Sequence, residues 1–407
     1  YGKKLGLLCQ VEVTYEDGST TTIITDEDWK GSNMGPITMN SLYDGETYDA
    51  TREMDGWNKH NFKDGDWDPV EIADYSLDNL IATETVPIRK IQELKPVKIW
   101  TTPKGTLVAD MGQNMVGWIK LKVKGDKGDV VTLRYAEVMD KYGEFYTTNL
   151  RAAKATSKYI LKGKGTEIYE PKFTFFGFRY VAIDGFPGEL TPDNLTGVVI
   201  HSDMKVTGNF ESSNPLLNQL QSNIQWGQKG NFLDVPTDCP QRDERLGWTG
   251  DAQAFISTAA YNMDVAAFFT KWMKDLSAEQ AENGMVPVVI PNVIHGEESS
   301  TGWGDVATIA PWTIFQVYGD KRILETQYAS MKAYTDYMAN RKNVPWKGFG
   351  DWLYYKPEIT QHTVPDGHTN QDLLIQAFIA YSAKLVALTA VELGNAVDVD
   401  NYWALFE

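Results

Sequence analysis

Hydrophobic and polar residues alternate along the first half of the chain in the pattern of short β-strands. The first alternating runs, within residues 7–25, flank the turn Glu16-Asp17-Gly18-Ser19 and predict a β-hairpin. Residues 30–85 contain many turn signals and few periodic runs. Further strands are predicted at residues 119–123, 130–137, 159–161, 173–183 and 195–201. Short strands at this spacing favour a β-sandwich or a jelly roll.

Near residue 208 the hydrophobic period changes from that of a strand to that of a helix. Asn214 and Pro215 are the residue types that cap and begin a helix. Later helices are predicted at residues 252–260, 264–282, 307–318, 321–340 and 372–393, with a last one from about residue 398. Successive helices without intervening strands indicate an all-α domain.

The helix predicted at residues 372–393 shows the clearest periodicity, and Gly394 is expected to end it. Its apolar face is expected to contain Leu374, Ala377, Phe378, Tyr381, Leu385, Leu388 and Val391.

These patterns predict a multidomain protein, β then α. Residues 1–85 are expected to form part of an N-terminal β-sandwich domain, and residues 86–206 a second, jelly-roll-like β-sandwich domain. Residues 207–407 are expected to be helical, and because their last helix stops at Glu407 this domain looks truncated.

The charge of the chain argues against two classes of partner. The 407 residues carry a net charge of −17. Such a surface repels phosphate backbones and anionic lipids, so we expect no nucleic-acid or membrane-surface role. No apolar stretch approaches the roughly 20 residues that span a bilayer. We expect Cys239 to be an unpaired thiol. Free thiols are typical of reducing compartments, so the sequence favours a cytoplasmic location, with a periplasmic or secreted location as the alternative.

The densest polar cluster of the chain lies at residues 238–251. It contains four carboxylates, two guanidinium groups and Trp248, and its Pro and Gly residues predict an irregular loop. A solvated, self-paired surface loop is the plainer interpretation of such a cluster. Apolar residues flank it on both sides, however, so we expect the loop to be held against a core. Glycines beside Trp248 would let the backbone approach a ligand closely.

This composition suits the hydrolysis of a glycosidic bond, which needs a carboxylic acid to protonate the leaving oxygen and a second carboxylate across the sugar ring. Glu244 has the longest reach of the four acids and is our choice for the proton donor. Asp238 and Asp251 could accept hydrogen bonds from sugar hydroxyls, and Trp248 could supply a flat apolar wall. We expect these four side chains to share one cavity.

Two other loops have a related composition. Trp303 lies between glycines and is followed by Asp305, and a third loop carries Asp351 and Trp352 after Gly350. We expect Trp303, Asp305 and Trp352 to contact the sugar. Core packing is an equally good explanation for Trp303. If the three loops converge, they would do so at one end of a helical barrel.

Other chemistries find little support in the sequence. The five histidines do not have the spacing of zinc ligands. They are His60, His201, His295, His362 and His368. There is no phosphate-binding glycine loop and no Gly-x-Ser-x-Gly elbow. We therefore predict no metal and no cofactor.

Residues 238–251, together with residues 226–232, resemble the signature of bacterial α-L-rhamnosidases of glycoside hydrolase family 78. The β region resembles this family as well, at residues 35–37, 43–50, 110–118 and 177–180. The resemblance extends over essentially the whole chain. It implies β-sandwich domains ahead of an (α/α)6 barrel, and an inverting mechanism.

The resemblance also assigns roles to individual residues. Glu244 matches the general acid of the family, and Asp238 and Asp251 match acids that hold rhamnose hydroxyls. Arg242 belongs to the same loop. The aromatic residues implied around the sugar are Trp248, Trp303 and, as a further wall, Trp352.

One part of the family pattern is missing. The general base of the family is a Glu in a Trp-Glu-Arg-Trp segment that precedes an Asn-His-Tyr segment, and neither segment occurs here. We therefore expect a fragment of a longer enzyme that has the acid side of the site and, alone, little activity. The expected function is release of terminal non-reducing α-L-rhamnose from glycosides or polysaccharides. The alternatives are a non-catalytic carbohydrate-binding fragment and an (α/α)6 glycosidase for another sugar. The sequence does not decide between a monomer and a homodimer.

Overall fold

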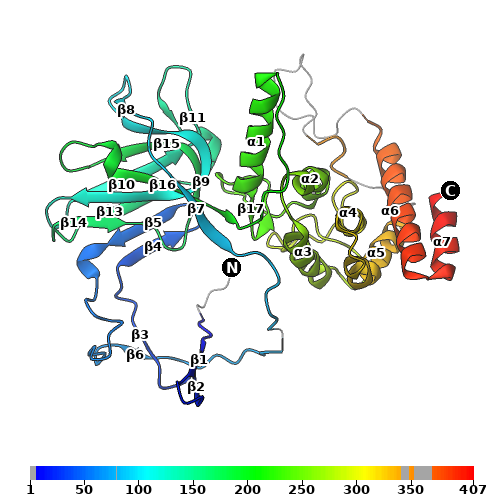
Figure 1. Cartoon of the computed structure of the whole chain (residues 1–407), viewed down its shortest axis with the longest axis horizontal. Coiled ribbons are helices and arrows are strands. Elements are labelled where there is room, and N and C mark those ends of the chain that lie inside the picture. The colour runs from blue at the N-terminus through cyan, green and yellow to red at the C-terminus, as the bar shows by residue number, and fades with distance from the viewer. Residues whose placement is uncertain (1–5, 79, 341–347, 353–368) are drawn as a thin grey trace.

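The computed structural model describes residues 6–78, 80–340, 348–352 and 369–407. Strands dominate up to residue 202 and long helices follow from residue 215, as predicted (Figure 1). Residues up to 206 are called the β part below, and residues from 207 the α part.

The predicted hairpin is present at the N-terminus. Strands β1 (Gln10–Thr14) and β2 (Thr20–Ile24) pair antiparallel around the expected turn. Strands β3 (Lys30–Gly31) and β6 (Asp68–Pro69) form a second small ladder. Both ladders are separate from the main sheet (Figure 1).

The main sheet of the β part has ten strands, and β9 is its longest. The first half of β9 pairs with β8 and β15, and its second half with β14 and β16. Tyr135, Phe176 and Phe178 stack in its fully buried core. The strands are β4 (Ile37–Ser41), β5 (Gly45–Asp49), β7 (Ile88–Leu94), β8 (Lys98–Thr101), β9 (Leu107–Lys124), β10 (Val130–Ala136), β13 (Thr156–Ile160), β14 (Thr166–Tyr169), β15 (Phe176–Asp184) and β16 (Leu195–Ser202).

This sheet crosses the domain boundary that we placed at residue 85. Strand β5 pairs in parallel with β13, with Gly45 opposite Thr156. A Cβ atom at Gly45 would lie 1.9 Å from the carbonyl oxygen of Thr156, so only glycine permits this approach. Residues 37–49 therefore belong to the main sheet. A pairing between strands so far apart in sequence leaves no local signal.

The α part contains the helices that the sequence predicts. Asn214 caps α1, because its Oδ1 accepts a hydrogen bond from the Leu216 N–H at 2.9 Å and Pro215 is the first helical residue. Helix α1 packs against β9 and β16, while α2 to α5 share a core around Trp272 (Figure 1). The helices are α1 (Pro215–Asn231), α2 (Thr249–Asn262), α3 (Ala266–Glu279), α4 (Val306–Tyr318), α5 (Arg322–Asn340), α6 (Gln371–Leu393) and α7 (Ala396–Phe406).

The predicted apolar face of α6 is only partly right, because Leu385 is buried as expected but other members of the face are not. Ile375, Ile379 and Val386 are buried against α4, α5 and α7, whereas Tyr381 and Val391 are exposed. This helix is apolar around most of its circumference, so its periodicity did not define one face. By length and composition it could cross a membrane, contrary to our expectation, although its buried side chains give the apolar residues a packing role.

Candidate active site

The acidic loop, defined here as residues 238–248, lies where the α part meets the β part. It follows β18 (Val235–Pro236) and precedes α2, so Asp251 belongs to the first turn of that helix. A Cβ atom at Gly177 in β15 would lie 3.0 Å from Gln241 Cβ and from Pro240 Cγ. The absence of a side chain at Gly177 therefore lets the acidic loop lie directly on the sheet.

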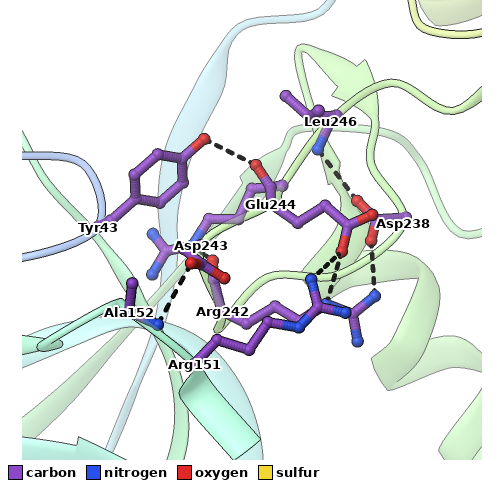
Figure 2. Close-up of polar contacts among 9 residues, drawn as sticks. Tyr43, Arg151, Ala152, Asp238, Arg242, Asp243, Glu244 and Leu246 are labelled. Carbon is purple, nitrogen blue, oxygen red and sulfur yellow. Dashed lines mark hydrogen bonds and ion pairs between the residues drawn. The ribbon is translucent and has the colours of Figure 1, made fainter. Parts of the chain in front are cut away.

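The carboxylate of Glu244 receives two guanidinium groups on one oxygen. Arg151 Nη1 donates to Glu244 Oε2 at 2.8 Å, and Arg242 Nε donates to the same atom at 2.9 Å (Figure 2). No described residue donates a hydrogen bond to Oε1. The side chain is 20% exposed, so the carboxylate is partly accessible to a ligand.

Arg242 links Glu244 to Asp238. Its Nη2 donates to Asp238 Oδ2 at 3.0 Å, while the Leu246 N–H donates to Oδ1 at 3.0 Å (Figure 2). Asp238 is only 7% exposed in its side chain. A hydrogen-bonded guanidinium thus neutralises charge between two partly buried carboxylates and fixes their relative position.

Asp238, Cys239 and Glu244 are close enough together to be tested as a metal site, with ligand atoms within 4.8 Å of one another. Their chemistry does not favour a cation. Burial raises the pKa of Cys239 to about 12, so the thiol stays protonated at neutral pH. Arg242 already occupies both carboxylates.

Asp238 and Asp251 line a cavity of about 390 Å³. Its other walls include the amide side chains of Gln228 and Asn231, the Phe255 ring and aliphatic side chains. The pKa of the Asp251 carboxyl group is raised, chiefly by the protein packed around it and next by the negative charge of Asp238. The residue is nevertheless accessible to water. Carboxylates and amides beside aromatic faces are groups that can bind sugar hydroxyls and ring faces.

A second cavity, of about 370 Å³, lies beside the first and shares Ala254 with it. Trp303 and Trp352 line it. Phe349 contacts both rings, with centroids 4.8 and 5.7 Å away, and it also lies 6.3 Å from Trp248. The three predicted loops therefore do converge, around Phe349.

The four side chains expected in one cavity are divided in the structure. Asp238 and Asp251 line the first cavity, but neither Glu244 nor Trp248 lines either of these two cavities. The bond from Arg151 holds the Glu244 carboxylate toward the β part.

Asp305 also differs from its prediction as a sugar-binding residue. It is fully buried and accepts hydrogen bonds from the Gly302 N–H at 2.7 Å and from Ser382 Oγ at 2.9 Å. Burial raises its pKa to about 6. Its carboxyl group supports the loop that carries Trp303 and does not face a cavity.

The glycines near Trp248 were expected to let the backbone approach a ligand, but in the structure they lie against other parts of the protein. A Cβ atom at Gly247 would lie 2.1 Å from the carbonyl oxygen of Ile290, and one at Gly250 would lie 2.6 Å from the Trp303 ring. Both cysteines are free thiols, as expected for Cys239. His362 and His368 lie outside the described residues.

Three family models match the chain in succession. They are the α-L-rhamnosidase N-terminal domain at residues 1–92, the bacterial α-L-rhamnosidase concanavalin-like domain at residues 100–201, and the bacterial α-L-rhamnosidase 6 hairpin glycosidase domain at residues 205–407. The chain belongs to the bacterial α-L-rhamnosidase family.

Individual α-L-rhamnosidases agree with these matches. The chain is 44% identical to one from Streptomyces avermitilis and 43% identical to one from Formosa agariphila, over 100 and 98% of its length. It spans only 38 and 44% of the length of these two relatives.

Solved α-L-rhamnosidases share the arrangement of β-rich domains followed by helices. The structure of the Streptomyces avermitilis protein complexed with L-rhamnose superposes with a TM-score of 0.89 at 43% identity, covering 98% of this chain and 38% of that one. The structure from Dictyoglumus thermophilum gives 0.93 at 38% identity, covering 98 and 45%.

Sequence patterns missed several groups at this candidate site. Tyr43 donates its hydroxyl to the carbonyl oxygen of Glu244 at 2.8 Å (Figure 2). Arg245, only 6% exposed, donates to the carbonyl oxygens of Leu42 and Phe175 at 2.9 and 2.8 Å. Tyr43 lies in the family-like segment 43–50 and Arg151 lies outside all such segments, but both are far from the acidic loop in sequence, so no local pattern could show that they contact it.

Proposed function

We propose that the protein is an α-L-rhamnosidase that releases terminal non-reducing α-L-rhamnose by an inverting mechanism. The observation that carries this proposal is the acidic loop, which places Glu244 beside Asp238 next to a cavity lined by carboxylates. The α-L-rhamnosidase relatives, and the related structure that holds L-rhamnose, support the choice of sugar.

In this proposal Glu244 is the general acid. Two guanidinium groups fix Oε2, which leaves Oε1 to give its proton to the departing glycosidic oxygen. Asp238 and Asp251 accept hydrogen bonds from rhamnose hydroxyls. The aromatic group around Phe349 supplies apolar faces for the ring and its methyl group.

The general base is proposed to come from outside these 407 residues, because the Trp-Glu-Arg-Trp segment of the family is absent from them. The α part would then be a section of an (α/α)6 barrel. Residues 1–407 alone should bind a sugar better than they hydrolyse one, because nothing in them is assigned to deprotonate the attacking water.

A panel of p-nitrophenyl glycosides tests this proposal in the full-length protein. Rapid release from the α-L-rhamnoside and slow release from the β-D-glucoside is the expected pattern. Proton NMR during the first turnovers should show β-L-rhamnose appearing before mutarotation. Preference for the glucoside would refute the sugar, and α-L-rhamnose as first product would refute the inverting mechanism. Binding of rhamnose without any hydrolysis would favour a carbohydrate-binding role.

A further inference from the structure

We infer that Arg151, from the β part, is a positioning residue for the proton donor Glu244, so that the β part completes the active site. This inference rests on the proposed function. Arg151 follows a short 3-10 helix, Thr148–Leu150, in the β part. It is not in the acidic loop, and its guanidinium group reaches that loop from the opposite side of the domain junction (Figure 2).

The contact between the two residues selects one carboxylate oxygen. Arg151 Nη1 and Arg242 Nε both donate to Oε2 of Glu244, at 2.8 and 2.9 Å. A carboxylate with both donors on one oxygen cannot rotate freely, so Oε1 keeps a fixed direction. A general acid needs this, because misplacement of a proton donor by about 1 Å can lower the rate about 100-fold.

The backbone of the acidic loop is fixed by other contacts. The Ala152 N–H donates to Asp243 Oδ2 at 3.2 Å, and the Tyr43 hydroxyl donates to the Glu244 carbonyl oxygen at 2.8 Å. Arg245 adds its two bonds to Leu42 and Phe175. Removal of the Arg151 guanidinium should therefore change the Glu244 side chain and leave the loop in place.

The backbone at Arg151 is strained, which a purely structural surface arginine would not need. Its φ and ψ are 57° and −119°, in a region that favours glycine. Its side chain is 56% exposed, so the ion pair itself adds little to stability. Strain of this kind is concentrated at functional sites, where the surrounding structure holds the residue in place.

The test compares leaving groups in the full-length enzyme. An alkyl rhamnoside needs a proton on its leaving oxygen, whereas p-nitrophenolate leaves with little assistance. We expect R151M to lower kcat/KM for methyl α-L-rhamnoside about 10- to 100-fold, with a change below about 3-fold for the p-nitrophenyl substrate. R151K, which keeps the charge, should recover much of the loss.

Arg89→Met is the matched control. Arg89 also lies in the β part, is 63% exposed and pairs with Asp203 at 3.2 Å, but it has no contact with the acidic loop. R89M should behave as wild type on both substrates. Equal losses on both substrates in R151M, or no loss on the methyl rhamnoside, would overturn the inference. A wild-type enzyme inactive on every rhamnoside would instead refute the proposed function, and this inference with it.

Discussion

Arg151 Nη1 lies 2.8 Å from Glu244 Oε2, although 93 residues separate the two in the chain. One residue belongs to a turn of the β part and the other to the loop that precedes α2. The proposed proton donor is therefore held by the β part and the α part at once. The β-rich domain acts as a wall of the site, and its turns should influence catalysis.

Arg151→Gly should leave the free energy of unfolding within about 1 kcal/mol of wild type. Glycine relieves strain of about 1–3 kcal/mol at φ 57°. Two effects oppose this gain. The glycine costs about 0.5–1 kcal/mol in backbone entropy on folding, and the substitution removes a weak, exposed ion pair. Urea denaturation measures the difference. A loss of about 3 kcal/mol would show that Arg151 is needed for the fold.

Arg245→Met should destabilise the protein by about 3 kcal/mol, because it leaves several partly buried carbonyl oxygens without their donors. Its guanidinium group bonds four of them, those of Leu42, Phe175, Gln241 and Arg242. Burial lowers its pKa to about 10, which still leaves it charged at neutral pH. Urea denaturation at pH 7 measures the loss, with the exposed Arg322→Met as control. A loss no larger than that of the control would contradict the role.

Asp305→Asn should change the pH dependence of stability. The pKa of Asp305 rises from 3.8 in the unfolded chain to about 6 in the fold, chiefly through burial. The folded protein thus holds this proton more tightly, and the resulting stability is complete below pH 3.8 and lost as the pH rises through 6. The difference between the unfolded and folded pKa values of Asp305 corresponds to about 3 kcal/mol in the free energy of unfolding.

The measurement is the free energy of unfolding of wild type minus that of D305N, from urea titrations at pH 4 and pH 7. The difference should shift by about 2–2.5 kcal/mol in favour of D305N at pH 7, because asparagine does not titrate and part of the full effect is already lost at pH 4. The surface variant D320N serves as control. A difference that stays constant would show that Asp305 is ionised throughout.

Asp251 should make sugar binding pH-dependent. Its pKa is raised by the surrounding protein and by the charge of Asp238, so it protonates at a higher pH than an ordinary aspartate. A protonated carboxyl group is a poorer acceptor for a sugar hydroxyl. Inhibition by L-rhamnose should therefore weaken as the pH falls, starting at a higher pH than an ordinary aspartate would give, and D251N should bind weakly at every pH. Equal pH dependence in wild type and D251N would contradict this.

Local patterns in the sequence predicted the parts of the structure that local physics determines. The Asn214 cap, the helices of the α part and the composition of the acidic loop follow from neighbouring residues. The bond from Arg151 to Glu244 and the pairing of β5 with β13 depend on long-range folding. Asp305 shows a third case. The sequence Gly-Trp-Gly-Asp suggests an exposed binding loop, but the Asp305 carboxyl group is buried and accepts a hydrogen bond from the Gly302 N–H of that loop.

The central claim is that Glu244 gives the proton to the leaving oxygen, and Glu244→Gln tests it most directly. The measurement is kcat/KM of the full-length enzyme for methyl and p-nitrophenyl α-L-rhamnosides, with D251N measured in parallel. E244Q should lose about 100- to 10,000-fold on the methyl substrate and far less on the p-nitrophenyl one, while D251N should lose similarly on both. Unchanged hydrolysis of the methyl rhamnoside by E244Q, or the selective loss appearing in D251N, would contradict the assignment.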